Sequence, residues 1–340
     1  MFATYTRLMI KFSPIYVNYR IIHNKSVIYM YGKSGDNQIC VTEEFRPYFL
    51  VVAENIDEFR SKVEKIKLEE DDKPDAYVTG TEIVEKKLVG KEVKAIKVYV
   101  NIPAAVPRIR DIVKDWPISN TYEYDIPLVN RYLIDKEITP LTTLEIDQLE
   151  VTNIQSVSQK SPNYKILAFD IETYNPQGKT IIPKEHPILM IALFGKNFKK
   201  VLTWKKFASN EKYIEFVSGE KEMLTRTKEL IKEYGPDIIT GYYSDGFDLP
   251  YIMERAKIHN IKFDIGANNT EPVKQRGKFA SIDIEGIANI DLINFIRIVI
   301  SRSLKTDSLK LNDVAHELLG EKKDDIDISK LAKSWDENSP

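Results

Sequence analysis

The stretch Lys165-Ile-Leu-Ala-Phe-Asp-Ile-Glu-Thr173 indicates a strand that carries two acids at one end. Its segment Ile166–Phe169 is apolar, as in a buried strand. Because strand side chains alternate between faces, Asp170 and Glu172 project the same way. Neighbouring carboxylates repel each other unless a proton or a cation lies between them, and their hard oxygen atoms suit Mg²⁺ or Mn²⁺. Such ions drive phosphodiester hydrolysis. The structural alternative is a strand that ends in solvated acids.

The composition is that of a globular protein. The chain has 340 residues, of which 43% are hydrophobic and 29% are charged, as expected for one very large domain or two to three ordinary ones. No apolar run approaches the roughly 18–20 residues of a membrane span, and the N-terminus lacks the features of a secretion signal. We therefore expect a cytoplasmic protein with no membrane partner. The net charge of −2 neither favours nor excludes nucleic acid. Cys40 is the single cysteine, which excludes an intrachain disulfide, and we expect it to be buried.

The pattern of apolar residues predicts two domains. Alternating short strands and helices over residues 1–135 indicate an α+β domain. Within it, the acidic stretch 69–75 is expected to be an exposed loop, and the polar stretch 135–163 is expected to be a linker. After the linker, a mixed sheet with helices packed on it is expected. Its strands are predicted at 165–173, 187–194, 200–204, 213–217 and 237–242, the first three antiparallel. Its helices are predicted at 218–233, 247–259, 290–300 and 308–319.

A third acid, Asp248, falls in the first turn of a predicted helix that follows a strand. A carboxylate is stabilised there by the helix dipole, so one interpretation is that Asp248 only caps its own helix. Alternatively, it lies at the same end of the sheet as Asp170 and Glu172 and completes a cage of three carboxylates. Spacing alone leaves both interpretations open.

Several motifs, in the same order, resemble those of family B DNA polymerases. Phe169-Asp-Ile-Glu-Thr173 is similar to the family's first exonuclease motif. Residues 237–252 resemble the second motif, whose essential Asp follows an aromatic residue, here Phe247-Asp248. Glu44-Phe-Arg-Pro-Tyr48 and residues 122–136 are similar to the N-terminal domain of archaeal members. The resemblance extends over nearly the whole chain.

The resemblance implies a mixed α+β N-terminal template-binding domain over residues 1–136. It implies an α/β, RNase H-like 3′→5′ exonuclease domain over residues 137–340. Asp170, Glu172 and Asp248 would be the catalytic residues and would hold two Mg²⁺ or Mn²⁺ ions. One ion would lower the pKa of the attacking water, and the other would stabilise the departing 3′-oxygen. The substrate would be a frayed single-stranded 3′ end, whose unpairing requires little energy at a mismatch.

The same resemblance implies binding partners, and the sequence differs from the family pattern at several positions. The implied partners are DNA, including the template strand, and a polymerase domain or second polymerase subunit. A sliding clamp is a further candidate partner. The expected location is the nucleoid. Tyr243 stands where the family usually has Asn, and Asp291 is expected to be structural. The family's third exonuclease motif, a Tyr and an Asp on one helix after the segment matching Leu331–Trp335, is not found. These departures predict a truncated or split enzyme that binds metal poorly and degrades DNA slowly or not at all.

In the N-terminal domain, the resemblance implies a pocket that captures template uracil. The matching residues are Tyr19, Pro47, Val106, Arg110, Ile126, Pro127, Arg131 and Tyr132. Leu128 replaces an aromatic residue, and Ala105 replaces an acid. A flipped base needs a tight apolar wall and an arginine that holds phosphate, and a tight wall would exclude the methyl group of thymine. The alternative is that residues 126–128 are core and that Arg131 pairs with Glu123 or Asp125.

Three functions from different classes therefore remain. The favoured one is the proofreading exonuclease portion of a DNA polymerase. The second is a non-catalytic module that binds DNA and senses template bases, and the third is an inactivated paralogue. The intact acids Asp170, Glu172 and Asp248 count against the third. The first 135 residues disfavour a stand-alone exonuclease, which would not need them.

Overall fold

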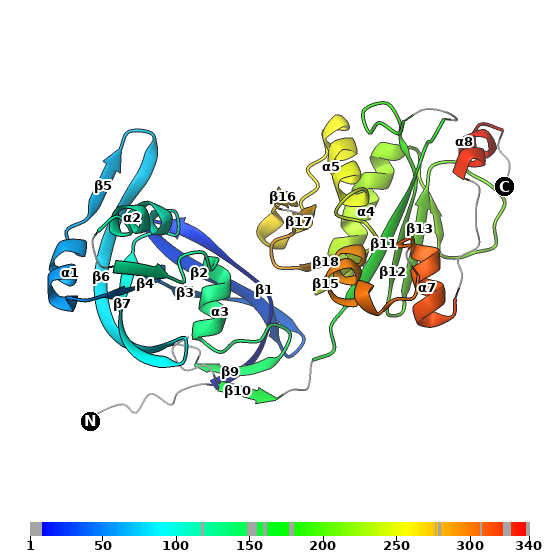
Figure 1. Ribbon diagram of the computed structural model, residues 1–340. Coiled ribbons are helices and arrows are strands. Elements are labelled where there is room, and N and C mark those ends of the chain that lie inside the picture. Colours follow the sequence, from blue (N-terminus) through cyan, green and yellow to red (C-terminus); the bar gives the residue numbers. More distant parts are fainter. Residues whose placement is uncertain are drawn as a thin grey trace, which may run out of the picture. The chain divides into compact units, whose positions relative to one another are not determined.

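The chain divides into two compact units, Met1–Pro162 and Asn163–Pro340 (Figure 1). The computed structural model describes residues 9–116, 119–147, 155–158, 162–176, 180–275, 277, 280–306, 308–321 and 328–337. Each unit has hydrophobic cores of its own.

The first unit contains two five-stranded antiparallel sheets. One has the order β10-β9-β1-β2-β3, formed by β1 (Met9–Ile22), β2 (Lys25–Ser34), β3 (Asn37–Glu44), β9 (Thr143–Asp147) and β10 (Gln155–Ser158). The other has the order β5-β6-β7-β4-β8, formed by β4 (Tyr48–Ala53), β5 (Lys67–Glu70), β6 (Lys73–Leu88), β7 (Lys91–Val100) and β8 (Ser119–Tyr122). The helices are α1 (Ile56–Val63), α2 (Ala105–Val113) and α3 (Leu128–Asp135). Strands and helices together confirm the predicted α+β class.

Part of the predicted linker is instead sheet. β9 pairs with β1 in the register Phe12↔Leu144, and Leu144 and Ile146 are buried in the core of the first unit. β10 pairs with β9 at the sheet edge. Because these strands return to β1, the division of the chain falls after Pro162 rather than after residue 136.

Two smaller predictions for this unit were wrong. The stretch 69–75 is not a loop but the tip of the β5–β6 hairpin, whose register includes Glu70↔Lys73. Its residues are nevertheless mostly exposed, as expected. Cys40 is exposed on β3 rather than buried. It pairs with Tyr31 on the face of the sheet opposite Met30 and Val41, and those two residues belong to or pack against the core.

The second unit contains a six-stranded mixed sheet with the order β14-β13-β12-β11-β15-β18. The strands are β11 (Ile166–Thr173), β12 (Ile188–Gly195), β13 (Phe198–Thr203), β14 (Ile214–Phe216), β15 (Ile238–Gly241) and β18 (Ala288–Asp291). β11, β12 and β13 are antiparallel, which confirms the prediction. β15 pairs parallel with β11, and β18 pairs parallel with β15. The carboxyl ends of three neighbouring strands therefore meet at one edge of the sheet.

Helices cover this sheet. α4 (Glu220–Tyr234) packs on β12 and β13, and α5 (Asp248–Ile258) lies beside α4 (Figure 1). The predicted helix at 290–300 begins later, because residues 288–291 form β18. The remaining elements are β16 (Val273–Gln275), β17 (Ser281–Asp283), α6 (Leu292–Phe295), a π-helical segment (Ile296–Ile300), α7 (Leu311–Leu319), α8 (Ile328–Asp336) and the short 3₁₀ turns Ala267–Asn269 and Ser301–Ser303. Among the described residues, no helix combines the length and apolar character that crossing a membrane requires.

Candidate functional site

β11 presents two acids on one of its faces. Leu167, Phe169 and Ile171 are buried in the core, so the alternate positions face away from it. Asp170 is exposed and Glu172 is half-buried. The strand thus holds both carboxylates on one face, at the edge of the sheet where β15 also ends.

Asp248 connects α5 to this strand. It is the first residue of α5 and is only 4% exposed. Its Oδ1 accepts a hydrogen bond from the backbone amide of Ile171, with an N···O distance of 3.1 Å. The helix begins after Phe247, where no side chain caps it. Asp248 therefore binds the main chain between the two acids of β11, while it also stands in the first turn of its own helix.

The surroundings of Asp248 raise the pKa of its carboxyl group. Burial raises the pKa of Asp248, and the neighbouring Asp170 carboxylate raises it further, to about 7 in total. A hydrogen bond between the two side chains acts in the same direction. Two carboxyl groups this close are stable with a proton or a cation between them. Asp170 and Asp248 thus come together as a pair.

Glu172 is the remaining predicted ligand. It is half-buried on the same face of β11 as Asp170. In the described parts of the chain, no three His, Cys, Asp or Glu side chains already stand in metal-binding geometry. A donor set made of carboxylate oxygens nevertheless fits the hard ions Mg²⁺ and Mn²⁺. The three-carboxylate cage stays a prediction.

A buried ion pair holds the elements that carry these acids. Glu220, at the start of α4, accepts hydrogen bonds from Arg255 Nε and from the Ile188 amide, both at 2.7 Å. His259 Nε2 lies 2.8 Å from the same carboxylate. Because Arg255 belongs to α5 and Ile188 begins β12, Glu220 fixes the positions of α5 and of the strand next to β11. The sequence pattern did not identify these residues, because their contacts join distant segments.

A second buried acid holds the loop between β15 and α5. Asp291, which is 5% exposed, accepts hydrogen bonds from the amides of Tyr243 at 2.8 Å and Asp245 at 3.1 Å. It also accepts one from the Ile293 amide at 3.2 Å and thereby caps α6. Burial raises the pKa of Asp245 to about 6, although a hydrogen bond from Asn289 opposes the shift. The structural role expected for Asp291 is confirmed.

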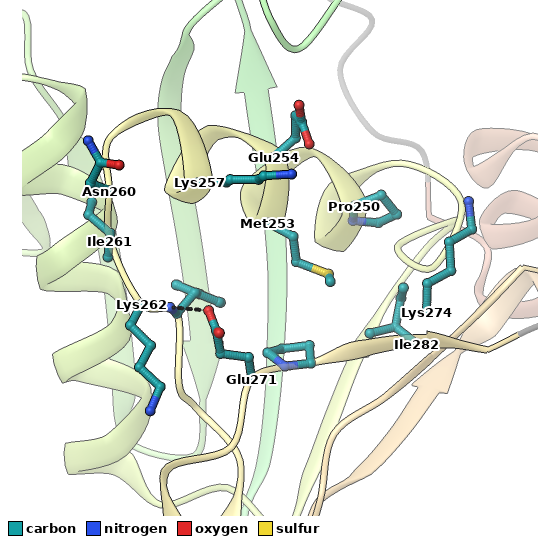
Figure 2. Close-up of a pocket in the computed structure, with 12 residues that line it drawn as sticks. Pro250, Met253, Glu254, Lys257, Asn260, Ile261, Lys262, Glu271, Lys274 and Ile282 are labelled. Atoms are coloured by element: carbon teal, nitrogen blue, oxygen red, sulfur yellow. Dashed lines mark hydrogen bonds between the residues drawn. The ribbon is translucent and has the colours of Figure 1, made fainter.

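A cavity of the second unit lies elsewhere, between α5 and the β16–β17 hairpin (Figure 2). Its volume is about 760 Å³. Figure 2 shows Met253 pointing from α5 toward it, and its lining carries both signs of charge, including Lys257, Glu254 and Lys274. None of the three predicted acids lines this cavity. The candidate catalytic site is therefore the open carboxylate cluster and not the cavity.

The first unit contains a smaller pocket of about 290 Å³. Six of the eight residues predicted for the uracil pocket line it: Tyr19, Pro47, Val106, Ile126, Pro127 and Arg131. Leu128, the departure from the family pattern, lines it as well and is mostly buried. The sequence thus predicted a set of residues that do converge on one concave surface, from β1, from the start of β4, from α2 and from the segment before α3.

The arginine of this pocket is already paired. The Nη2 atom of Arg131 lies 2.7 Å from Oε2 of Glu123, and its Nη1 lies 3.8 Å from Oδ1 of Asp135. Its guanidinium stacks 4.8 Å from the ring centroid of Tyr48. The alternative pairing of Arg131 with Glu123 is therefore present, and the two acids neutralise its charge.

Two of the eight predicted residues lie outside the pocket lining. Tyr132 is fully buried, and its hydroxyl donates to Oε2 of Glu43 at 2.7 Å. The guanidinium of Arg110 lies 4.2 Å from the ring centroid of Tyr124, which does line the pocket. Tyr132 is thus part of the core, whereas Arg110 stands behind a pocket residue.

Comparisons with known proteins agree with both units. The family model described as DNA polymerase family B, exonuclease domain, matches residues 119–314. A DNA polymerase of Methanocaldococcus jannaschii is 36% identical over 323 residues, which cover 94% of this chain and 19% of that protein. A DNA polymerase of Pyrococcus glycovorans is 32% identical over 315 residues, which cover 92% of this chain and 37% of that protein.

A solved structure has the same fold. The family B DNA polymerase from the hyperthermophilic archaeon Pyrobaculum calidifontis matches with a TM-score of 0.77 and 23% identity, covering 96% of this chain and 42% of that one. The present chain spans well under half the length of these relatives. The family model covers more than half of the chain. The chain therefore belongs to the family B DNA polymerases and contains the exonuclease domain of that family.

Proposed function

We propose that this chain is the N-terminal and proofreading portion of a family B DNA polymerase, and that its second unit removes nucleotides from the 3′ end of single-stranded DNA. The observation that carries the proposal is the pairing of Asp248 with Asp170 across α5 and β11. Family membership supports DNA as the substrate. The synthetic portion of the enzyme, on this polypeptide or on a second subunit, would be its partner, and a sliding clamp and a place at the nucleoid belong to the same proposal.

Each of the three acids would have a role as a metal ligand. Asp170 and Glu172 would offer oxygen ligands from a strand fixed in the sheet, and Asp248 would offer one from the start of α5. Bound Mg²⁺ or Mn²⁺ would activate water and stabilise the leaving 3′-oxygen. The hydrogen bond from Ile171 keeps Asp248 in place. Asp170 is exposed, so the 3′ end of a DNA strand can approach it from solvent.

We expect Asp170→Asn and Asp248→Asn to slow the shortening of a 5′-labelled single strand by at least about 100-fold, because each removes a charged metal ligand. The measurement uses protein in excess over DNA, with Mg²⁺ or Mn²⁺, so that a low rate is also detected. Glu229→Gln, an exposed acid on α4, is the matched control and should keep the wild-type rate. Cleavage of circular single-stranded DNA, which has no 3′ end, would contradict the proposal.

A second function is favoured by the pocket of the first unit. We propose that it captures uracil from a template strand, because six of the eight residues predicted for that task line it. One methyl group in a tight apolar site is worth about 10- to 200-fold in affinity. Single-stranded DNA with one deoxyuridine should therefore bind at least about 10-fold more tightly than the thymidine control.

The matched variants place the same bulk inside and outside the pocket. Ile126→Trp adds an indole to the lining and should abolish the preference for uracil. Ile134→Trp adds it at a position on α3 that is 60% exposed, and the preference should remain. Equal affinities of the wild type for both strands would remove this function.

A further inference from the structure

The loop between β15 and α5, residues 242–247, joins two residues that lie against the main chain next to Asp170. At its start, a Cβ on Gly241 would lie 3.2 Å from the carbonyl oxygen of Phe169, so the two main chains pass closely. At its end, Asp248 accepts the hydrogen bond from the Ile171 amide. The residues that flank the loop therefore lie against the main chain on both sides of Asp170. The loop itself is at the same end of the sheet as the carboxylate pair.

Tyr243 is such a side chain, and its backbone is strained. Its φ angle is 65°, a left-handed conformation that disfavours bulky residues. Hydrogen bonds hold the strained backbone in place. Asp291 accepts one from the Tyr243 amide, and the Tyr243 carbonyl accepts two from the amides of Gly246 and Phe247, at 3.1 and 3.0 Å. Strain of this kind persists where the surrounding structure enforces it, and it is concentrated at functional sites.

The ring of Tyr243 is presented without a partner of its own. A Cβ on Gly246 would lie 2.3 Å from Cε2 of Tyr243, so only a glycine there leaves room for the ring. The residue is 47% exposed. Among the described residues, none hydrogen-bonds to its hydroxyl and none stacks on its ring. The ring therefore does not serve the core, although its backbone is fixed.

We propose that the Tyr243 ring is a stacking platform for the terminal base of a single strand whose 3′ end lies at Asp170 and Asp248. The proposal rests on the exonuclease function proposed above and adds the group that holds the base. Stacking on an aromatic side chain tolerates every base, because each has a π-face. Such stacking changes affinity by about 5- to 150-fold per base.

The test is a cycle of two changes, one in the protein and one in the DNA. A 5′-labelled oligothymidylate with phosphorothioate 3′ linkages, which slow hydrolysis, is compared with the same strand ending in an abasic sugar, in Ca²⁺. Loss of the terminal base should weaken binding to the wild type by about 5- to 150-fold. Tyr243→Asn, which tolerates the left-handed backbone, should bind both strands equally. Tyr243→Phe should behave as the wild type.

The outcomes separate the two proposals. If the wild type binds the 3′-ended strand no better than circular single-stranded DNA, the exonuclease proposal fails and the platform fails with it. If it prefers the 3′ end but base removal weakens the wild type and Tyr243→Asn equally, only the platform is overturned. The melting temperature of Tyr243→Asn should not fall, because the substitution relieves strain. A fall together with equal effects of base removal would assign the ring a structural role instead.

Discussion

Asp248→Asn is expected to stabilise the metal-free chain by up to about 4 kcal/mol at pH 8, since a shift of one pKa unit corresponds to about 1.4 kcal/mol. Burial and Asp170 raise the pKa of Asp248 to about 7 in the folded state, whereas an unfolded Asp has a pKa of about 3.9. Between these values the folded chain binds more protons, so the free energy of unfolding falls as pH rises from about 4 to about 7. Asn cannot ionise, so the variant does not lose this free energy of unfolding as the pH rises.

The measurement is urea unfolding at several pH values in the presence of a chelator. The difference between wild type and Asp248→Asn should be small near pH 4 and largest near pH 8. At pH 8, Mg²⁺ or Mn²⁺ should stabilise the wild type, because the cation replaces the missing proton, and should act less on the variant. A constant difference across the pH range would show that Asp248 ionises freely in the folded chain.

Glu220→Gln is expected to destabilise the second unit by about 3–5 kcal/mol, the usual effect of breaking a buried ion pair from one side. Burial alone would raise the pKa of Glu220, but hydrogen bonds from Arg255 and the Ile188 amide hold it below its ordinary value. Both partners are nearly inaccessible, with side-chain exposures of 9% for Arg255 and 6% for Glu220. Loss of the carboxylate leaves the Arg255 charge buried without compensation.

The matched control is Glu229→Gln, the same substitution on the same helix. Its ion pair with Arg226 is exposed, so the effect should stay below about 1 kcal/mol. Urea unfolding is followed by tryptophan fluorescence, to which Trp204 contributes; its indole donates to the Ile188 carbonyl beside Glu220. Similar midpoints for the two variants would contradict the role assigned to Glu220 in fixing α5 against the sheet.

The antiparallel part of the second unit's sheet could be predicted because its strands are apolar runs with local partners, whereas β18 falls where a helix was expected. β11, β12 and β13 follow one another and pair in that order. β9 was missed because it is short and pairs with β1, which lies far away in the sequence. Alternating Leu144 and Ile146 are the signal that could have identified it.

The candidate site was predictable in part for the same reason. Asp170 and Glu172 lie on one strand, so their relation follows from alternation alone. The contact of Asp248 with Ile171 depends on how a helix packs on the sheet, which spacing left open. The roles of Glu220 and of the strained Tyr243 depend on contacts between distant segments and on a backbone angle, and residue types alone encode neither.

Release of mononucleotides from a single-stranded 3′ end is the decisive measurement for the proposed exonuclease. It is measured for the wild type and for Asp170→Asn, Glu172→Gln and Asp248→Asn, with Mg²⁺ or Mn²⁺ and with a chelator. With protein in excess over DNA, we expect metal-dependent release by the wild type, slow as the departures from the family pattern predict, and a loss of at least about 100-fold in all three variants. Wild-type release by Glu172→Gln would reduce the site to the Asp170–Asp248 pair. Undiminished release by Asp170→Asn, or release that persists in the chelator, would contradict the account.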